Sequence, residues 1–230
     1  MMYEYDLIVV GAGPYGRSIA AHATAAGLHL RLLGRRTQRA ALPVDERKVT
    51  AVRPYGRDGF EVVTADGESM RTRTVALALG PNPLTEPALP AREFPPHSPC
   101  GEADRAGPAP ARHKRFYAAH PALFRRLPTF VRVLLTDRPT GPMSGGTTRY
   151  RASTDRVTVL SMPVRRRLSR TPDAPPWVDT RFESAHPGLF FAGLLTAAFF
   201  GPAIRSAHGA EFTARRVLKG VRRRLGTRPR

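Results

Sequence analysis

The sequence predicts an α/β fold in which a parallel sheet, with a glycine-rich turn at its edge, continues into a three-stranded antiparallel meander. Two observations predict the parallel part. Short apolar runs with the length of buried strands occur near both ends of the chain, and glycines spaced as GxGxxG follow the first of them. The meander is predicted by two Asp-Gly turn dipeptides, at 58–59 and 66–67, between short alternating runs.

The N-terminal segment predicts a strand, a turn, a helix and a second strand. The apolar run 7–10 precedes Gly11, Gly13 and Gly16, and an alanine-rich helix over 18–26 leads to a strand over 28–33. Glycines at this spacing allow a tight turn, close approach of the backbone to a pyrophosphate, and close packing of the helix, whose N-terminus favours a phosphate. The segment therefore predicts a Rossmann-like dinucleotide site.

The residues after the second strand leave the nucleotide open. An acidic side chain at this place normally holds a ribose hydroxyl, but the sequence has Gly34, followed by Arg35 and Arg36. Arginines are suited to the 2′-phosphate of NADP, so NADP competes with FAD on this local evidence.

The next elements are predicted from turn signals and apolar runs. Strands over 48–53, 60–64 and 68–73 form the meander, and a further strand over 75–79 ends at Gly80. Nine prolines in 81–110 predict a loop or linker, because proline cannot donate a backbone hydrogen bond. An interrupted helix over 114–135 and a strand over 156–162 follow.

The C-terminal segment repeats the pattern of a strand, a glycine and a helix. A buried strand over 189–192 ends at Gly193, and Pro202 is placed as the first residue of a helix that reaches about residue 218. We expect this strand to join 7–10, 28–33 and 75–79 in one parallel sheet, with Gly193 near the first glycine turn.

Composition limits the classes of function. The chain has 230 residues, a net charge of +19 and a single cysteine, Cys100, which excludes an internal disulfide and favours a reducing compartment. The N-terminus has no basic flank of a signal peptide, and the apolar stretch 189–204 is too short and too interrupted to span a membrane, so we predict a cytoplasmic protein without a transmembrane segment. The histidines lack metal-ligand spacing, so no metal site is predicted, and no catalytic residue is identified.

The basic charge is almost entirely arginine, because lysine occurs only at 48, 114 and 219. This bias accompanies abundant Pro, Ala and Gly and is typical of a GC-rich coding sequence. We expect the arginine-rich C-terminal tail to be solvated, and we expect no specific nucleic-acid partner.

Three stretches resemble bacterial FAD-dependent oxidoreductases of the flavin-containing monooxygenase type, within the FAD/NAD(P)-binding superfamily. They are "DLIVVGAGPYGRSIAAH", "VALALGPNPLTEPALP" and "RFESAHPGLFFAGLLTAAFFGPAIRSAHGAEFTARRV". The resemblance implies FAD as the cofactor. It also implies that the flavin end faces the helix start near residue 202, where the helix dipole would stabilise the anionic reduced ring. The implied cofactor-binding residues are Gly11, Gly13, Pro14, Tyr15, Gly16, Gly34, Arg35, Val49, Gly80, Gly193, Gly201, Pro202 and Ala203.

The sequence also departs from this family. Leu79 replaces a threonine of the linker strand, and Leu194 stands where many flavoproteins place an aspartate toward the ribityl hydroxyls. The family's second GxGxxG unit, which binds NADPH, does not occur between Gly80 and Pro187. We therefore expect a discontinuous FAD-binding domain from 1–85 and 175–230, with 86–174 as a shortened, partly irregular remnant of the NADPH and substrate region.

These features leave three interpretations open. The first is an FAD-binding oxidoreductase that acts on an unidentified small molecule, with impaired NADPH-driven turnover and a reductant supplied by a separate reductase or a loosely bound nicotinamide. The second is a non-catalytic nucleotide-binding remnant. The third is a basic interaction protein on a Rossmann scaffold.

Overall fold

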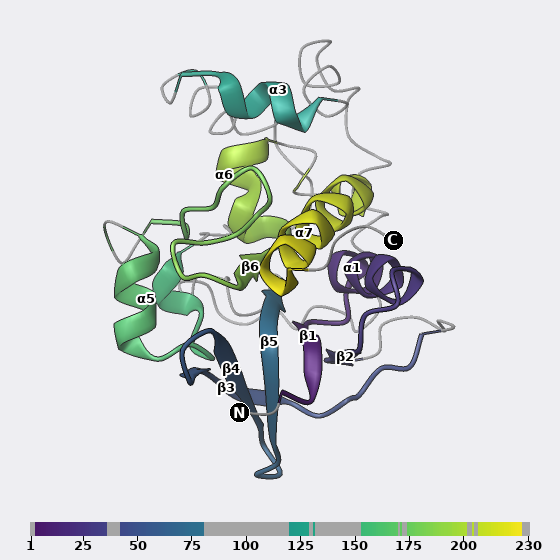
Figure 1. Cartoon of the computed structure of the whole chain (residues 1–230). Coiled ribbons are helices and arrows are strands. Elements are labelled where there is room, and N and C mark those ends of the chain that lie inside the picture. The colour runs from purple at the N-terminus through teal and green to yellow at the C-terminus, as the bar shows by residue number, and fades with distance from the viewer. Residues whose placement is uncertain are drawn as a thin grey trace, which may run out of the picture.

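The computed structural model describes residues 3–35, 42–80, 120–128, 131, 153–169, 171, 174–201, 204 and 207–226. Its centre is one sheet in the order β2-β1-β5-β4-β3, with β6 also paired to β5 (Figure 1). The strands are β1 Tyr5–Val10, β2 Leu30–Leu33, β3 Val49–Tyr55, β4 Gly59–Thr64, β5 Ser69–Leu77 and β6 Leu189–Phe191.

The parallel part of the sheet contains β2, β1, β5 and β6, as predicted. Most of its apolar side chains are fully buried, among them Leu7–Val9, Val75–Leu77 and Leu189–Phe191. Burial of this kind contributes about 25 cal/mol for each Å² of apolar surface removed from water. The strand near the C-terminus therefore completes a core that the first 80 residues begin.

Strand β5 differs from the sequence prediction because it is one continuous strand rather than two. Its residues 69–72 pair antiparallel with β4, and its residues 75–77 pair parallel with β6 along the same edge. Where β5 changes partner, Thr72 and Thr74 are fully buried, and the hydroxyl of Thr74 donates to the carbonyl of Asp6 at 2.6 Å. The sequence prediction ended one strand at residue 73 and began another at 75. The strand continues through this polar stretch because its threonines are buried and Thr74 is hydrogen-bonded.

Two long helices lie side by side, as Figure 1 shows for α1 and α7. Their bounds are α1 Pro14–Ala25 and α7 Ala210–Leu225. Imidazole Nε2 of His22 on α1 lies 3.1 Å from carboxylate Oε1 of Glu211 on α7. Small residues on both helices, including Ala20, Ala23 and Ala214, are fully buried, which permits this close packing.

The final helix begins later than predicted. A 3₁₀ turn at Ala207–Gly209 precedes α7, whose first residue is Ala210 and whose end extends to Leu225, where Gly226 adopts the left-handed conformation that often terminates a helix. The predicted first residue, Pro202, lies outside the described residues.

The prediction of a strand over 156–162 is wrong. Leu160 forms only an isolated bridge with Val52, and helix α5 starts at Met162 and ends at Leu168. The buried apolar residues of this segment recur every three or four positions, which is a helical period: Val157, Leu160, Val164 and Leu168.

The remaining described helices are short. They are α3 Pro121–Arg126, α6 Ala197–Phe200 and the 3₁₀ turns Thr154–Arg156 and Gly193–Thr196. Helix α3 lies over α6 in Figure 1 and is the described part of the helix predicted for 114–135. The linker predicted for 81–110 lies outside the described residues.

Candidate dinucleotide site

The candidate site lies at one edge of the sheet. Strands β1, β5 and β6 run parallel, so their carboxyl ends meet there, and Gly11, Ala78 and Gly193 follow them (Figure 1). Open α/β sheets bind ligands outside the carboxyl ends of their strands. The topology thus confirms that the strand before Gly193, β6, belongs to the same sheet as the strand before the GxGxxG turn, β1.

Two glycines of the turn are required by the fold itself. Gly11 has φ +111°, and a Cβ atom there would lie 2.2 Å from the carbonyl oxygen of Ala78. A Cβ on Gly16 would lie 1.7 Å from the carbonyl oxygen of Gly11. The turn therefore lies so close to the residue after β5, and to the start of α1, that no side chain would fit at Gly11 or Gly16.

Gly13 is different, because nothing in the described part of the chain requires a glycine there. Its φ of −71° and ψ of −175° suit any residue, and a Cβ there would meet no described atom within 4 Å. Gly13 is also the N-cap of α1, which has no side-chain cap and no acidic residue in its first turn. An open surface beside uncapped N–H groups fits a pyrophosphate, and a side chain at position 13 would fill it.

The end of β2 explains why no acidic residue follows this strand. Gly34 has φ +145°, and a Cβ there would lie 2.7 Å from the backbone nitrogen of Ala12. The chain passes too close to the glycine turn for a side chain. The next residue, Arg35, is exposed.

An ionic cluster fixes the loop that follows. The Gly34 N–H donates to the Asp45 carbonyl at 2.9 Å, and the Asp45 carboxylate lies 2.5 Å from Arg47 Nη2 and 2.8 Å from Arg31 Nη2. Hydrogen bonds from Arg47, and then from Arg31, hold the pKa of Asp45 well below its usual range. Arg47 also pairs with Glu68 in the meander, so the cluster ties β2 to the turn before β5.

Tyr15 connects the glycine turn to the C-terminal segment. Its hydroxyl donates to the carbonyl of Ile204 at 2.9 Å. Its ring lies beside Gly193, where a Cβ would be 3.4 Å from Tyr15 Cδ2. Gly193 has φ +74°, a conformation that favours glycine whatever the space around it.

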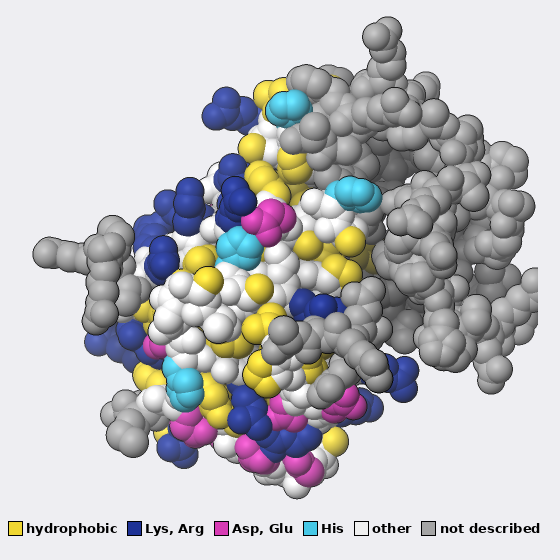
Figure 2. Space-filling model, turned by 90° about the vertical axis from the view of Figure 1, so that its right-hand side faces the viewer, with side chains coloured by type: hydrophobic (Ala, Val, Ile, Leu, Met, Phe, Trp, Pro, Cys, Tyr) yellow, Lys and Arg dark blue, Asp and Glu magenta, His cyan; other side chains and the backbone are white. Residues whose placement is uncertain are grey.

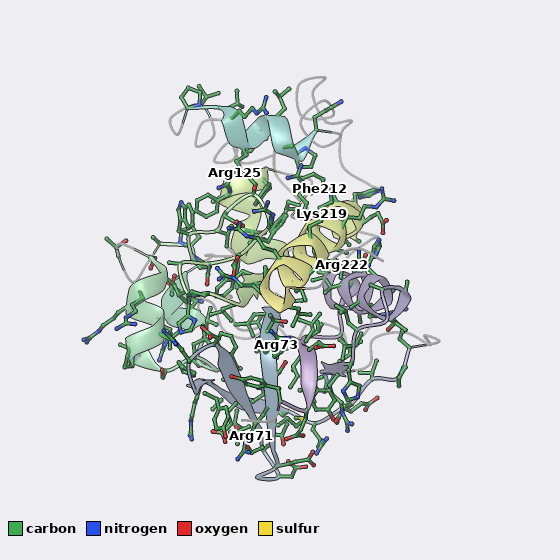
Figure 3. All side chains as sticks on the ribbon, viewed as in Figure 1. Arg71, Arg73, Arg125, Phe212, Lys219 and Arg222 are labelled. Carbon is green, nitrogen blue, oxygen red and sulfur yellow. The ribbon has the colours of Figure 1, made fainter. Side chains whose placement is uncertain are left out.

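An aromatic cluster packs behind this segment. The rings of Phe182 and Phe200 stack with centroids 4.0 Å apart, and Phe212 meets both edge-on. The Arg125 guanidinium lies 5.1 Å from the Phe200 ring centroid, and Figure 3 shows Arg125 and Phe212 near α6. Gly201 is buried with φ +88°, and a Cβ there would lie 2.8 Å from the ring of Phe124.

The structure brings many of the sequence-predicted residues into direct contact at the glycine turn and gives the burial and packing of others. Gly11, Gly13, Tyr15 and Gly16 form the turn, with Pro14 as the first residue of α1, and Gly34 and Gly193 adjoin it. Val49 is buried at the start of β3, Gly80 is exposed after β5, and Gly201 packs under Phe124. Pro202 and Ala203 lie outside the described residues.

Sequence reasoning missed three contributors. They are the Ala78 carbonyl, the Asp45 loop and the Phe124 ring against Gly201. Only Asp45 had a signal, as an acidic residue two positions before Arg47. The other contacts join segments far apart in the chain and leave no local pattern.

The fold is that of Rossmann-like FAD/NAD(P)-binding proteins. A flavin-containing monooxygenase from Stenotrophomonas maltophilia matches with a TM-score of 0.55 and 17% identity, covering 98% of this chain and 99% of that one. A thioredoxin reductase from Streptococcus pyogenes has a TM-score of 0.51 and 13% identity over 96% and 98% of the chains. A ferredoxin-flavin thioredoxin reductase from Clostridium acetobutylicum has a TM-score of 0.51 and 13% identity over 98% and 100%.

At these identities the likeness shows the fold alone. No family model matches the sequence, and a search of curated proteins gave no match. In the described part of the chain, no helix is long and apolar enough to cross a membrane. Nor do three or more His, Cys, Asp or Glu side chains gather there in a way that could hold a metal ion.

Proposed function

We propose that the protein binds FAD at the carboxyl edge of its sheet and acts as a flavin-dependent oxidoreductase of the flavin-containing monooxygenase type. The observation that carries this proposal is the open surface at Gly13, beside the uncapped start of α1. Gly193 lies on the same edge, next to Tyr15, as a site spanning a whole dinucleotide requires.

In this proposal the glycine turn from Gly11 to Gly16 holds the pyrophosphate, with Pro14 and Tyr15 within it. Gly34, Arg35 and Val49 border the adenosine, and Gly80 and Gly193 border the ribityl chain. Gly201, Pro202 and Ala203 face the pyrimidine end. FAD, when bound, would supply the electron-transfer chemistry, while the chain's own residues bind and orient it.

We also propose that the reducing equivalents come from outside this chain. Residues 81–187 contain no second GxGxxG unit to place a nicotinamide. One structural neighbour is called a ferredoxin-flavin thioredoxin reductase. Its name refers to ferredoxin and to no nicotinamide, which is consistent with a separate protein as the reductant. A discontinuous domain from 1–85 and 175–230 fits this proposal, with β6 and α7 packed on the first half of the chain.

One observation favours a second candidate, NADP binding at the same turn. Arg35 is exposed directly after Gly34, where a guanidinium could pair with a 2′-phosphate. A chain that held NADP and no flavin would be the non-catalytic remnant or the interaction protein considered above.

The test is the visible absorbance of the purified full-length protein. We expect a flavin band, and chromatography of the supernatant after denaturation should identify FAD. If the protein is isolated colourless, apo protein should be titrated with FAD and with NADP, followed by intrinsic fluorescence. Binding of NADP without FAD would replace the proposal with the second candidate, and binding of neither would reject both.

A further inference from the structure

One side chain bridges two segments of the site that are 189 positions apart in the sequence. The Tyr15 hydroxyl donates to the Ile204 carbonyl at 2.9 Å, and the Tyr15 ring lies against Gly193. Ile204 is 1% exposed and Tyr15 is half-buried, so water competes little for this hydrogen bond. The contact is tertiary and cannot arise from local chain geometry.

Both ends of the bridge are held by other contacts. Tyr15 is the second residue of α1, directly after the Gly13–Pro14 start of the helix. At the other end, the Ile204 N–H donates to the Gly201 carbonyl at 3.2 Å, and the Gly201 N–H donates to the Ala197 carbonyl at 2.9 Å. The ring of Phe124 packs against Gly201. Each segment is thus held by its own contacts, and the Tyr15 hydroxyl links one segment to the other.

We infer that Tyr15 is a positioning residue that holds the C-terminal segment at the distance from the glycine turn that a flavin dinucleotide needs. This inference rests on the proposed FAD binding. The glycine turn would meet the pyrophosphate, whereas the segment ending at Ile204 would meet the flavin end. A ligand that occupies only the turn should not depend on the hydroxyl, and a ligand that spans both segments should.

The experiment compares FAD with ADP, which has the adenosine and pyrophosphate but no flavin. Apo wild type and Tyr15→Phe are titrated with both ligands. A neutral hydrogen bond contributes on the order of 1 kcal/mol, so we expect Tyr15→Phe to raise the Kd for FAD about five- to tenfold. The Kd for ADP should stay within about twofold. In the FAD-loaded protein, the visible circular dichroism of the flavin should also change.

Tyr55→Phe is the matched control, because Tyr55 lies on β3 against Tyr3 and Arg71, in the meander. Both Kd values should match wild type in this variant. Thermal unfolding of each apo variant checks that the fold is kept.

The outcomes separate the two proposals. Suppose that wild type binds both ADP and FAD. If Tyr15→Phe then weakens the binding of both ligands equally, or of neither ligand, the positioning role is rejected and FAD binding stands. If wild type binds ADP but not FAD, or binds neither ligand, the proposed function fails and the positioning role fails with it.

Discussion

The glycines of the first turn show that one residue type can serve separate purposes a few positions apart. A Cβ at Gly11 or Gly16 would lie too close to backbone atoms, whereas a Cβ at Gly13 would meet no described atom within 4 Å and the backbone there is ordinary. The first two are therefore folding requirements, whereas the described part of the chain gives no reason for the third, which the proposed pyrophosphate contact would explain. Substitutions at these positions should separate stability from binding.

We predict opposite effects for Gly13→Asn and Gly11→Ala. Asparagine is a good N-cap residue and suits the backbone at position 13, so the free energy of unfolding of the apo protein should change by less than about 0.5 kcal/mol. Its side chain would occupy the open surface, and FAD affinity should fall at least about 100-fold by titration. Gly11→Ala should lower the free energy of unfolding by more than about 3 kcal/mol, measured by urea denaturation, because its methyl group meets backbone atoms. Unimpaired FAD binding by Gly13→Asn would show that the open surface is not the pyrophosphate site.

At the scale of elements, the loop after β2 is held by charge as well as by the apolar packing of Leu42 and Val44 against the core. The Asp45 carboxylate is 12% exposed and accepts hydrogen bonds from Arg31 and Arg47, while the Asp45 backbone pairs with Leu32 and Gly34. This loop keeps the end of β2 against the glycine turn, and so it supports the side of the candidate site where we propose that the adenosine binds.

We predict that Asp45→Asn destabilises the protein by about 1 kcal/mol at neutral pH, a modest value because the arginines remain partly solvated. The pKa of Asp45 is lowered in the folded state, so its stabilising contribution is full above the unfolded pKa of about 4 and is lost as the pH falls through the folded pKa. Urea denaturation of both proteins should show a difference at pH 7 that shrinks steadily below about pH 4. A difference independent of pH would assign the cost to packing instead.

The elements also show where sequence patterns suffice. Buried apolar runs and Asp-Gly turns predicted the parallel strands and the meander, because strand length, hydrophobic pattern and turn conformation can be read from the local sequence. The continuity of β5 was missed because Thr72 and Thr74 are polar yet fully buried. The contacts of Tyr15 with Ile204 and of Phe124 with Gly201 were missed because only the folded chain brings these residues together.

For the whole molecule, the net charge of +19 does not by itself define a partner. Figure 2 shows Lys and Arg side chains mainly along the left side and the lower end of the face in view, with most of its Asp and Glu side chains toward the lower end. On α7, Arg215 pairs with Glu211 at 2.8 Å and Arg224 pairs with Glu183, while Lys219 and Arg222, labelled in Figure 3, lie between these two arginines along the helix. Part of the basic charge therefore stabilises the fold, as a composition rich in arginine allows.

The arrangement of the whole chain leads to a prediction about turnover. The candidate site is built from both ends of the sequence, and the residues between them contain no second GxGxxG unit. Hydride transfer needs the nicotinamide held in near-attack geometry, and such positioning contributes several kcal/mol, about 7 or more in favourable cases. We therefore expect the FAD-loaded protein, mixed anaerobically with NADPH, to keep its visible flavin absorbance for many minutes, while dithionite bleaches it at once as a control for reducibility. Bleaching within seconds at micromolar NADPH would mean that the segment between the two halves builds a nicotinamide site without the glycine turn, and that no separate reductase is needed.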